Sequence, residues 1–450
     1  MSASVPTGDG TQAQLPLLTE SGDQTARAAT SRPARQQAAV YRLHRRWQFW
    51  AVVVVLGLAA VGLKWVSPNL RFWYHLRAGR SELARYHNPQ AIRHLQECLD
   101  FRSHDPGTLL LAARAARRAR SYPECEQLLA KYQEARGLDE AVSLEQFLLA
   151  AERGVDRAAQ QCWSRVEKRD PDTPLILEAL ARGYLRQYRL GQAHLCLERW
   201  LELEPENAQA HYLEGLLQLD YAHARGPAEV SYRRAVELDP EHEEARLGLA
   251  VTLINDKNFA EAVEHLEYVR QRQPDNLSVQ VGLAECQEGL GHEEEAARLL
   301  DRVLEVQPQM PSALAVRGRI ALDQGDLGTA ETRLRQAIAS NPGDPRPRYN
   351  LVVVLNQCGK QEEARQCEKD LKQLEEDHKR FHEIIMQELA QRPQDPALHC
   401  EAGQLLLRGG QVEEGLRWLQ SALRLDPNYA PAKKTLEEFR NKTGTKPDER

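Results

Sequence analysis

Eight cysteines carry the most reactive side chains in this chain of 450 residues. No two of them have the Cys-x-x-Cys spacing of a zinc or redox site, and none belongs to a Cys-x-x-Cys-His haem attachment sequence. Most lie on or beside apolar positions, where a thiol behaves as a small hydrophobic group. We therefore expect free, buried thiols, with a bridge between Cys358 and Cys367 as the alternative. The eight are Cys98, Cys125, Cys162, Cys196, Cys286, Cys358, Cys367 and Cys400.

His378 and His382 are the second candidate for chemistry, because residues four apart share one face of a helix. Glu375 and Asp377 lie close to them in the sequence. The His-Glu-x-x-His order of zinc proteases is absent, however, and the sequence offers no third ligand. We expect packing or solvated histidines here and no metal.

The sequence also lacks the short motifs of nucleotide and hydrolase sites. We find no Walker-type phosphate loop, no Gly-x-Gly-x-x-Gly after a strand, and no Gly-x-Ser-x-Gly. The carboxylates are interspersed with basic residues along helix faces, which is typical of a solvated surface. The sequence therefore predicts no cofactor and no catalytic site, and we expect a protein that is not an enzyme.

The strongest organising feature is a series of prolines at a nearly constant interval. Six of the seven steps between them are 34 or 35 residues, and the seventh is 51. Such self-similarity is typical of a solenoid, in which each unit covers the apolar face of its neighbour. The prolines are Pro171, Pro205, Pro240, Pro274, Pro308, Pro342, Pro393 and Pro427.

Two apolar stripes with helical spacing precede Pro274. Asp256 to Asn258 forms a polar turn between them, so the unit reads as two short amphipathic helices that bury both stripes. Pro274 ends the second helix because it has no amide hydrogen. The first stripe is Ala245, Leu249, Ala250 and Leu253, and the second is Phe259, Ala262, Val263, Leu266 and Val269.

This pattern resembles the tetratricopeptide repeat family, which has large, Leu, small and large positions on the first helix and Ala, large, Ala and Pro on the second. Arg317 and Gly415 depart from it. The resemblance implies an all-α, right-handed superhelical solenoid of about ten helix-turn-helix repeats over residues 70–441, with 428–440 as a capping helix and 442–450 as a disordered tail. One matching unit reads Leu283, Ala284, Gly291, Ala296, Leu300, Val303 and Pro308.

Residues 47–67 read as a transmembrane helix. Twenty helical residues span about 30 Å, the thickness of the hydrocarbon core. Trp47, Trp50 and Trp65 lie near the ends of the apolar run, as in an interfacial belt. The alternatives are a cleaved signal peptide, a buried core helix and an interfacial helix, but the flanking sequence lacks a small-residue cleavage site and the run has no polar face.

The charge of the chain changes at this segment. Residues 1–48 carry a net charge of +3 and the whole chain −6, so the rest carries −9. Residues 1–46, rich in small and polar residues, are predicted to be a disordered basic tail. The positive-inside rule puts that tail in the cytoplasm and the repeats outside it. A mildly acidic solenoid is a poor phosphate binder, so we expect no nucleic acid.

In tetratricopeptide repeat proteins the first helices line a concave groove that holds peptides or partner segments. The positions of the carboxylate clamp found in chaperone-binding members hold Leu247, Val251, Ala315 and Glu401 here, so no clamp is expected. The mixed polar and apolar lining fits an extended or helical protein segment, with ordinary packing between repeats as the alternative. The groove residues implied by phase are Leu247, Val251, Asn255, Gln280, Val281, Ala315, Arg319, Asn350, Val354 and His399.

The 51-residue interval contains a long helical stretch, at about 361–391, with a short coiled-coil-like seam. Such a helix either projects from the stack and pairs with a partner or with itself, or packs back as a half-repeat insertion. The seam consists of Leu371, Leu374, His378, Phe381 and Ile385.

These features predict a membrane-anchored, non-catalytic scaffold that binds other proteins through its groove. The alternatives are an accessory subunit or domain of an envelope-biogenesis enzyme complex, and a homo-oligomeric structural protein. A catalytic domain needs a non-repeat segment of about 100 residues or more, and the repeats leave no such segment.

Overall fold

The computed structural model describes residues 69–167, 170–221 and 225–443. The predicted tail over 1–46, the predicted transmembrane helix over 47–67 and most of the predicted C-terminal tail lie outside the described residues. Among the residues described, no helix is both long and apolar enough to cross a membrane. The chain divides into two units, Met1–Arg71 and Phe72–Arg450, and the second contains the repeats.

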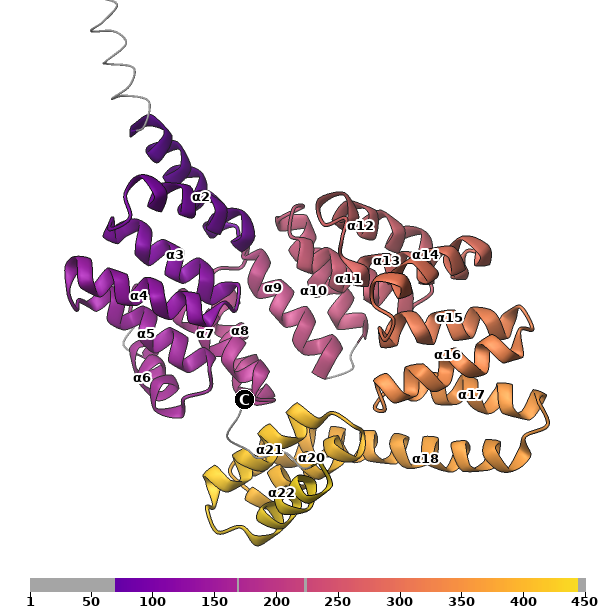
Figure 1. Ribbon diagram of the computed structural model, residues 1–450. Coiled ribbons are helices and arrows are strands. Elements are labelled where there is room, and N and C mark those ends of the chain that lie inside the picture. Colours follow the sequence, from indigo (N-terminus) through magenta and orange to yellow (C-terminus); the bar gives the residue numbers. More distant parts are fainter. Residues whose placement is uncertain (1–68, 168–169, 222–224, 444–450) are drawn as a thin grey trace, which may run out of the picture. The chain divides into compact units, whose positions relative to one another are not determined.

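Helices and turns build the described chain, and the helices pair into ten successive hairpins within it (Figure 1). The fold is thus an all-helical solenoid, as the repeats predict. The pairs are the helix over 69–84 with α2 (Asn88–Phe101), α3 (Pro106–Arg118) with α4 (Tyr122–Arg136), α5 (Glu140–Glu152) with α6 (Asp156–Glu167), α7 (Thr173–Arg186) with α8 (Leu190–Leu203), α9 and η1 (Ala208–Leu216, Leu217–Tyr221) with α10 (Arg225–Leu238), α11 (Glu243–Asn255) with α12 (Phe259–Arg272), α13 (Leu277–Gly289) with α14 (Glu293–Val306), α15 (Pro311–Asp323) with α16 (Leu327–Ser340), α17 (Pro345–Gln357) with α18 (Gln361–Glu383), and α20 (Pro396–Arg408) with α21 (Val412–Leu425). The chain continues from α18 into η2 (Ile384–Glu388) and α19 (Leu389–Gln391), and α22 (Ala430–Thr443) follows the last hairpin.

A residue in the left-handed backbone region ends the turn between the two helices of nine hairpins. Its φ angle lies between +55° and +90°, where glycine meets no Cβ penalty. From Tyr86 to Tyr188, and again from Lys257 to Gly359, these residues recur every 34 positions. The repeat therefore extends unbroken into the N-terminal hairpins, where the periodic proline is absent. The residues are Tyr86, Arg120, Gly154, Tyr188, Lys257, Gly291, Gly325, Gly359 and Gly410.

Polar side chains start many of the first helices. Asp105, Asn207 and Asn276 each accept a hydrogen bond from a backbone amide two or three residues later. Such caps satisfy amide groups that have no partner inside the helix. They explain why an Asp or Asn so often follows the repeat proline.

Close contact between hairpins requires small residues at the helix crossings. A Cβ atom on Gly183 would lie 2.5 Å from the carbonyl oxygen of Ala151, so α5 and α7 approach each other only because residue 183 has no side chain.

Two hairpins depart from the 34-residue period, and both contain a π-helical turn. A π turn has i→i+5 hydrogen bonds and holds one residue more than an α turn. The turn η1 accounts for the single extra residue between Pro205 and Pro240. In the other hairpin the helix is lengthened as far as Gln391, with η2 near its end.

The structure corrects the interpretation of this long helix as a projecting element. Leu374 and Ile385 are each only 7% exposed, and Phe381 packs against the core. Two ion pairs also connect α18 to α20, because Arg408 reaches Asp377 at 2.9 Å and Arg380 reaches Glu401 at 2.7 Å. The seam is covered by the same chain, and of its predicted members only His378 is exposed.

The apolar core consists of successive clusters between hairpins, one of which joins parts far apart in the sequence. Side chains of α5 to α9 share that cluster with η2, α20 and α21. Trp200, which is fully buried, belongs to it. The fourth and the last hairpins therefore pack against each other through Tyr188 and Trp418.

Candidate binding surface on the first helices

The first helices of consecutive hairpins α11, α13, α15 and α17 contact one another in order. Figure 1 shows them following each other along the stack. We call the face they share the first-helix surface. It is the part of the molecule on which most of the predicted groove residues lie.

A small pocket opens on this surface between α13, α15 and α17. Its volume is about 50 Å³, which fits one side chain rather than a whole ligand. Three predicted groove residues come together in its lining, namely Ala315, Arg319 and Asn350. The other lining residues are Glu285, Ser312, Val316, Arg346 and Pro347.

Arg319 gives the pocket its charge pattern. Its guanidinium pairs with Glu288 and lies 3.6 Å from Glu285, while its Nε atom is buried without a hydrogen-bond partner among the described residues. Burial raises the pKa of Glu288, although Arg319 acts in the opposite direction. Arg319 is therefore held in place by two acids and keeps one donor unused.

The second arginine of the pocket, Arg346, pairs with Asp344 at 2.9 Å. Asn350 contributes an amide that both donates and accepts hydrogen bonds. Ala315, Val316 and Pro347 add apolar surface between these groups. The lining contains no cysteine or histidine, and its chemistry is that of binding by hydrogen bonds, charge and apolar contact.

The groove prediction is wrong for Val281 and Val354. Val281 is 4% exposed and Val354 is fully buried, because their phase on the helix turns them into the core between hairpins. Leu247 is half-buried and packs against a core cluster. Val251, which is 48% exposed, and the exposed Asn255 remain available on the surface of α11.

Gln280 and His399 have a structural contact that the sequence analysis missed. In five hairpins, the residue six positions after the repeat proline donates a side-chain hydrogen bond to that proline's carbonyl oxygen. Gln280 reaches Pro274 at 3.0 Å, and His399 reaches Pro393 at 3.0 Å. The signal for this hydrogen bond in the sequence is a polar residue six positions after the repeat proline. The other three pairs are His211 with Pro205, Arg246 with Pro240, and Arg348 with Pro342.

The N-terminal first helices α3, α5 and α7 carry a buried ion network that the sequence analysis also missed. Arg117 is fully buried and pairs with Glu145 at 3.1 Å and with Glu152 at 2.8 Å. Arg118 pairs with Glu178 at 2.6 Å. These charges neutralise one another inside the stack, so this part of the first-helix face differs from the part around Arg319.

All eight cysteines lie in the described part of the chain and are free thiols. Six are buried, as expected, and Cys358 and Cys367 are not bridged. Burial raises the pKa of Cys98 to about 11 and that of Cys125 to about 12, so these thiols stay protonated at neutral pH. Across the described ranges, no three His, Cys, Asp or Glu side chains are grouped so as to hold a metal ion.

The helical hairpins and the inward small residues define a helical-repeat protein. Tetratricopeptide repeat profiles match residues 228–277, 253–320 and 321–387. The chain therefore contains tetratricopeptide repeats, and proteins with such repeats bind peptides or proteins.

One relative is cellulose synthase operon protein C from Xanthomonas axonopodis pv. citri (strain 306). It is 28% identical over 229 residues, which are 46% of this chain. The match spans only 15% of the length of that relative.

Two solved structures are similar to parts of this chain. A tetratricopeptide repeat protein from Parabacteroides merdae ATCC 43184 has 16% identity and a TM-score of 0.34, with 64% of this chain and 99% of that chain covered. The human IFIT1 dimer with m7Gppp-AAAA has 16% identity and a TM-score of 0.41, with 72% and 90% covered. Nothing about function follows from these values.

Proposed function

We propose that this protein is a non-catalytic scaffold that binds a segment of another protein on its first-helix surface. The observation that carries the proposal is the meeting of Ala315, Arg319 and Asn350 in one pocket formed by three consecutive repeats. A pocket made by neighbouring repeats places its polar groups along the stack, so it presents them to an elongated ligand rather than to a compact one.

The chemistry of the surface indicates what such a segment presents. The unused Nε donor of Arg319 fits an acceptor such as a backbone carbonyl. The apolar lining from Ala315, Val316 and Pro347 fits a small or medium apolar side chain. An extended or helical segment that alternates polar and apolar groups satisfies both.

The same proposal includes attachment to a membrane through residues 47–67. The length and the flanking tryptophans of this segment support a single-pass anchor. The excess of arginine before it supports an N-terminus in the cytoplasm and repeats on the other side. A scaffold held in this way recruits its partner to the membrane surface.

A second candidate function is that of an accessory subunit of an envelope polysaccharide enzyme complex. It is favoured by the name of the relative, cellulose synthase operon protein C. In this role the chain would use the same first-helix surface, and its partner would be a subunit of the synthesis machinery.

The binding proposal is tested by affinity isolation of the full-length chain from detergent-solubilised membranes of its own cells. We expect the double variant Arg319→Ala, Asn350→Ala to lose a protein that the unaltered chain retains. The matched control is Arg302→Ala, which alters an exposed arginine on α14. Equal recovery of every protein by all three chains contradicts the proposal, and the identity of the retained protein separates the two candidate functions.

The anchor is tested separately by extraction with alkaline carbonate and by protease protection. The full-length chain is expected to stay in the pellet, while a chain without residues 47–67 is released. Protease added to intact cytoplasmic-side-out vesicles is expected to spare the repeats. Release of the full-length chain by carbonate, or digestion of the repeats in those vesicles, contradicts this part.

A further inference from the structure

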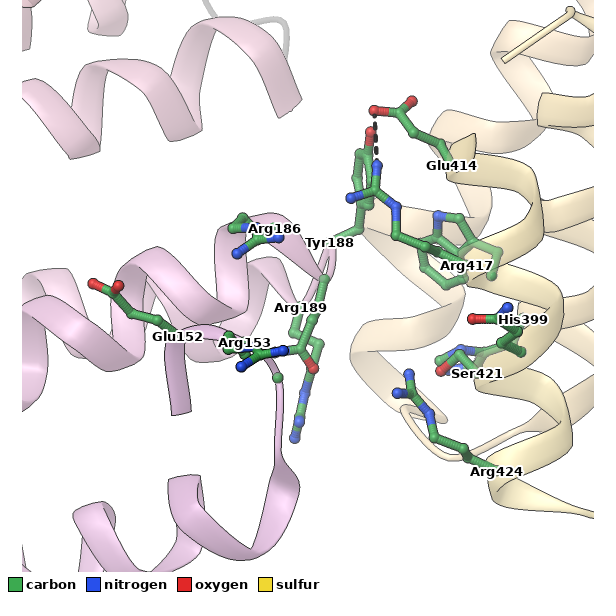
Figure 2. A pocket seen from close by; sticks show the side chains of 14 residues that line it. Glu152, Arg153, Arg186, Tyr188, Arg189, His399, Glu414, Arg417, Ser421 and Arg424 are labelled. Carbon is green, nitrogen blue, oxygen red and sulfur yellow. Dashed lines mark ion pairs between the residues drawn. The ribbon is translucent and has the colours of Figure 1, made fainter. Parts of the chain in front are cut away.

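A larger cavity, separate from the first-helix pocket, lies between the fourth and the last hairpins. Its volume is about 260 Å³. Figure 2 shows Arg186 and Arg189 on one side and Arg417 and Arg424 on the other. We call it the arginine cavity. Its lining consists of Glu152, Arg153, Gly154, Arg186, Gln187, Tyr188, Arg189, His399, Glu414, Arg417, Trp418, Gln420, Ser421 and Arg424.

The lining has five arginines and two glutamates, although the chain as a whole carries a net charge of −6. Three of these arginines have acidic partners, since Arg153 pairs with Glu126, Arg189 with Asp156, and Arg417 with Glu414. The other two have no carboxylate partner within the described chain.

Those two arginines stand on opposite walls of the cavity. Arg186 donates to the hydroxyl of Tyr122 at 2.6 Å and lies over that ring. Arg424 is exposed and has no ion pair to any described residue. Because an arginine fork matches a carboxylate, each wall offers an unused site for an anionic group.

Three buried polar atoms of the lining also have no hydrogen-bond partner in the described chain. They are Oε2 of Glu152, Nδ1 of His399 and Nε1 of Trp418. The exposed fractions of these residues are 2% for Glu152, 8% for His399 and 4% for Trp418. A buried polar atom without a partner loses the hydrogen bonds that it makes with water in the unfolded chain. Their gathering in one lining indicates that a ligand or solvent supplies the missing bonds.

The donor and acceptor roles of these atoms follow from their neighbours. Nε2 of His399 lies 3.0 Å from the carbonyl oxygen of Pro393, which only accepts, so this nitrogen carries the proton. In the neutral ring Nδ1 is then an acceptor. Oε1 of Glu152 pairs with Arg117 at 2.8 Å. In the carboxylate form favoured by that pair, Oε2 is a second acceptor, although burial raises the pKa of Glu152. The indole of Trp418 is a donor. A ligand that satisfies the cavity must therefore offer both N–H donors and oxygen acceptors.

We propose that the arginine cavity binds an acidic peptide segment of a partner protein. Carboxylates of the segment pair with Arg186 and Arg424. Its backbone amides donate toward His399 and Glu152, and a backbone carbonyl accepts from Trp418. A fully ionised phosphate supplies only acceptors, so it leaves the acceptors of the cavity without partners. The site is separate from the first-helix pocket and goes beyond the function proposed above.

The test measures fluorescence anisotropy of a labelled hexapeptide of alternating Gly and Glu with the full-length chain in nonionic detergent. The matched probe has Gln in place of each Glu, and inorganic phosphate is the competitor. The double variant Arg186→Gln, Arg424→Gln removes both guanidinium groups that have no carboxylate partner. Ser421→Glu is a second variant that adds a negative charge to the lining without removing an arginine. Arg302→Gln, outside the cavity, is the control.

We expect the Glu peptide to bind and the Gln peptide to bind at least about tenfold more weakly, since a charge-assisted hydrogen bond is about twice as strong as a neutral one. Both cavity variants are expected to show a similar loss, and the control none. Absence of binding overturns the proposal, as does equal binding by cavity variants and control. Displacement of the peptide by equimolar phosphate also overturns it, because the cavity would then be a phosphate site.

Discussion

The rings of Tyr188 and Trp418 lie 5.6 Å apart between their centroids, at an interplanar angle of 40°. Phe381 meets both rings edge-on. These three side chains come from the turn before α8, from α18 and from α21, and they form the contact between hairpins that are far apart in the sequence. The same contact forms one side of the arginine cavity.

Removal of Trp418 is expected to destabilise the protein substantially. Trp418→Ala opens a void in the largest core cluster, and such truncations cost about 3–5 kcal/mol. Trp73→Ala, at a side chain that is 58% exposed, is the control and is expected to change stability by less than about 0.5 kcal/mol. Urea denaturation followed by circular dichroism measures both, and equal midpoints would show that the aromatic contact contributes nothing.

The buried ion network gives a second prediction. Arg117→Met leaves Glu145 and Glu152 with one cationic partner fewer in a buried site, and breaking such a pair costs about 3–5 kcal/mol. Arg199→Met interrupts the exposed pair with Glu202, which is worth about 0–1 kcal/mol. The same denaturation experiment compares the two variants, and a loss at Arg199 as large as that at Arg117 contradicts this account.

The left-handed turns predict a stabilising substitution. Lys257 has a φ of +62°, a conformation that costs a residue with a Cβ atom about 1 kcal/mol relative to glycine. Lys257→Gly is therefore expected to raise the free energy of unfolding by about that amount. Gly291→Lys is expected to lower it similarly, since Gly291 occupies the equivalent position at +86°. The thermal midpoints of both variants are to be compared with that of the unaltered protein.

The buried His399 predicts a loss of stability in acid. Burial lowers the pKa of His399, and Arg189 and Arg424 lower it further, against the effect of the bond to Pro393. The unfolded state therefore binds a proton at a higher pH than the folded state does. The stability from neutral His399 is complete above about pH 6.5 and is lost as the pH falls through the lower folded pKa, by about 1.4 kcal/mol per pKa unit.

His399→Gln keeps a donor toward Pro393 but does not titrate. Its free energy of unfolding, measured from pH 8 to pH 5, is expected to fall less than that of the unaltered protein. Parallel curves for the two proteins would mean that His399 has an ordinary pKa.

The repeat itself could be predicted from the sequence because Pro240 and Pro274 mark a helix end in each unit, and Ala250 and Ala262 mark a close crossing. The N-terminal units were harder to predict, since Arg120 and Tyr188 take the left-handed position that most of the later units fill with glycine. Sequence spacing assigns the faces of a helix only to within one residue. This explains why the groove prediction included Val281, which is buried.

The arginine cavity could not be found from the sequence. It depends on the approach of Arg186 on α7 and Arg424 on α21, which are brought to one place only by the packing of distant hairpins. The long helix was difficult for the same reason. The apolar seam around Leu374 looks identical in the sequence whether it faces a partner or α20.

The most direct test of the central claim is photo-crosslinking from the first-helix surface of the full-length chain in its own cells. A photoreactive phenylalanine replaces Asn350 in one variant and Arg302, on α14, in the other. The account predicts a discrete cross-linked partner from position 350 and none from position 302. No adduct from position 350, or the same adducts from both positions, would contradict the claim that this surface binds a protein.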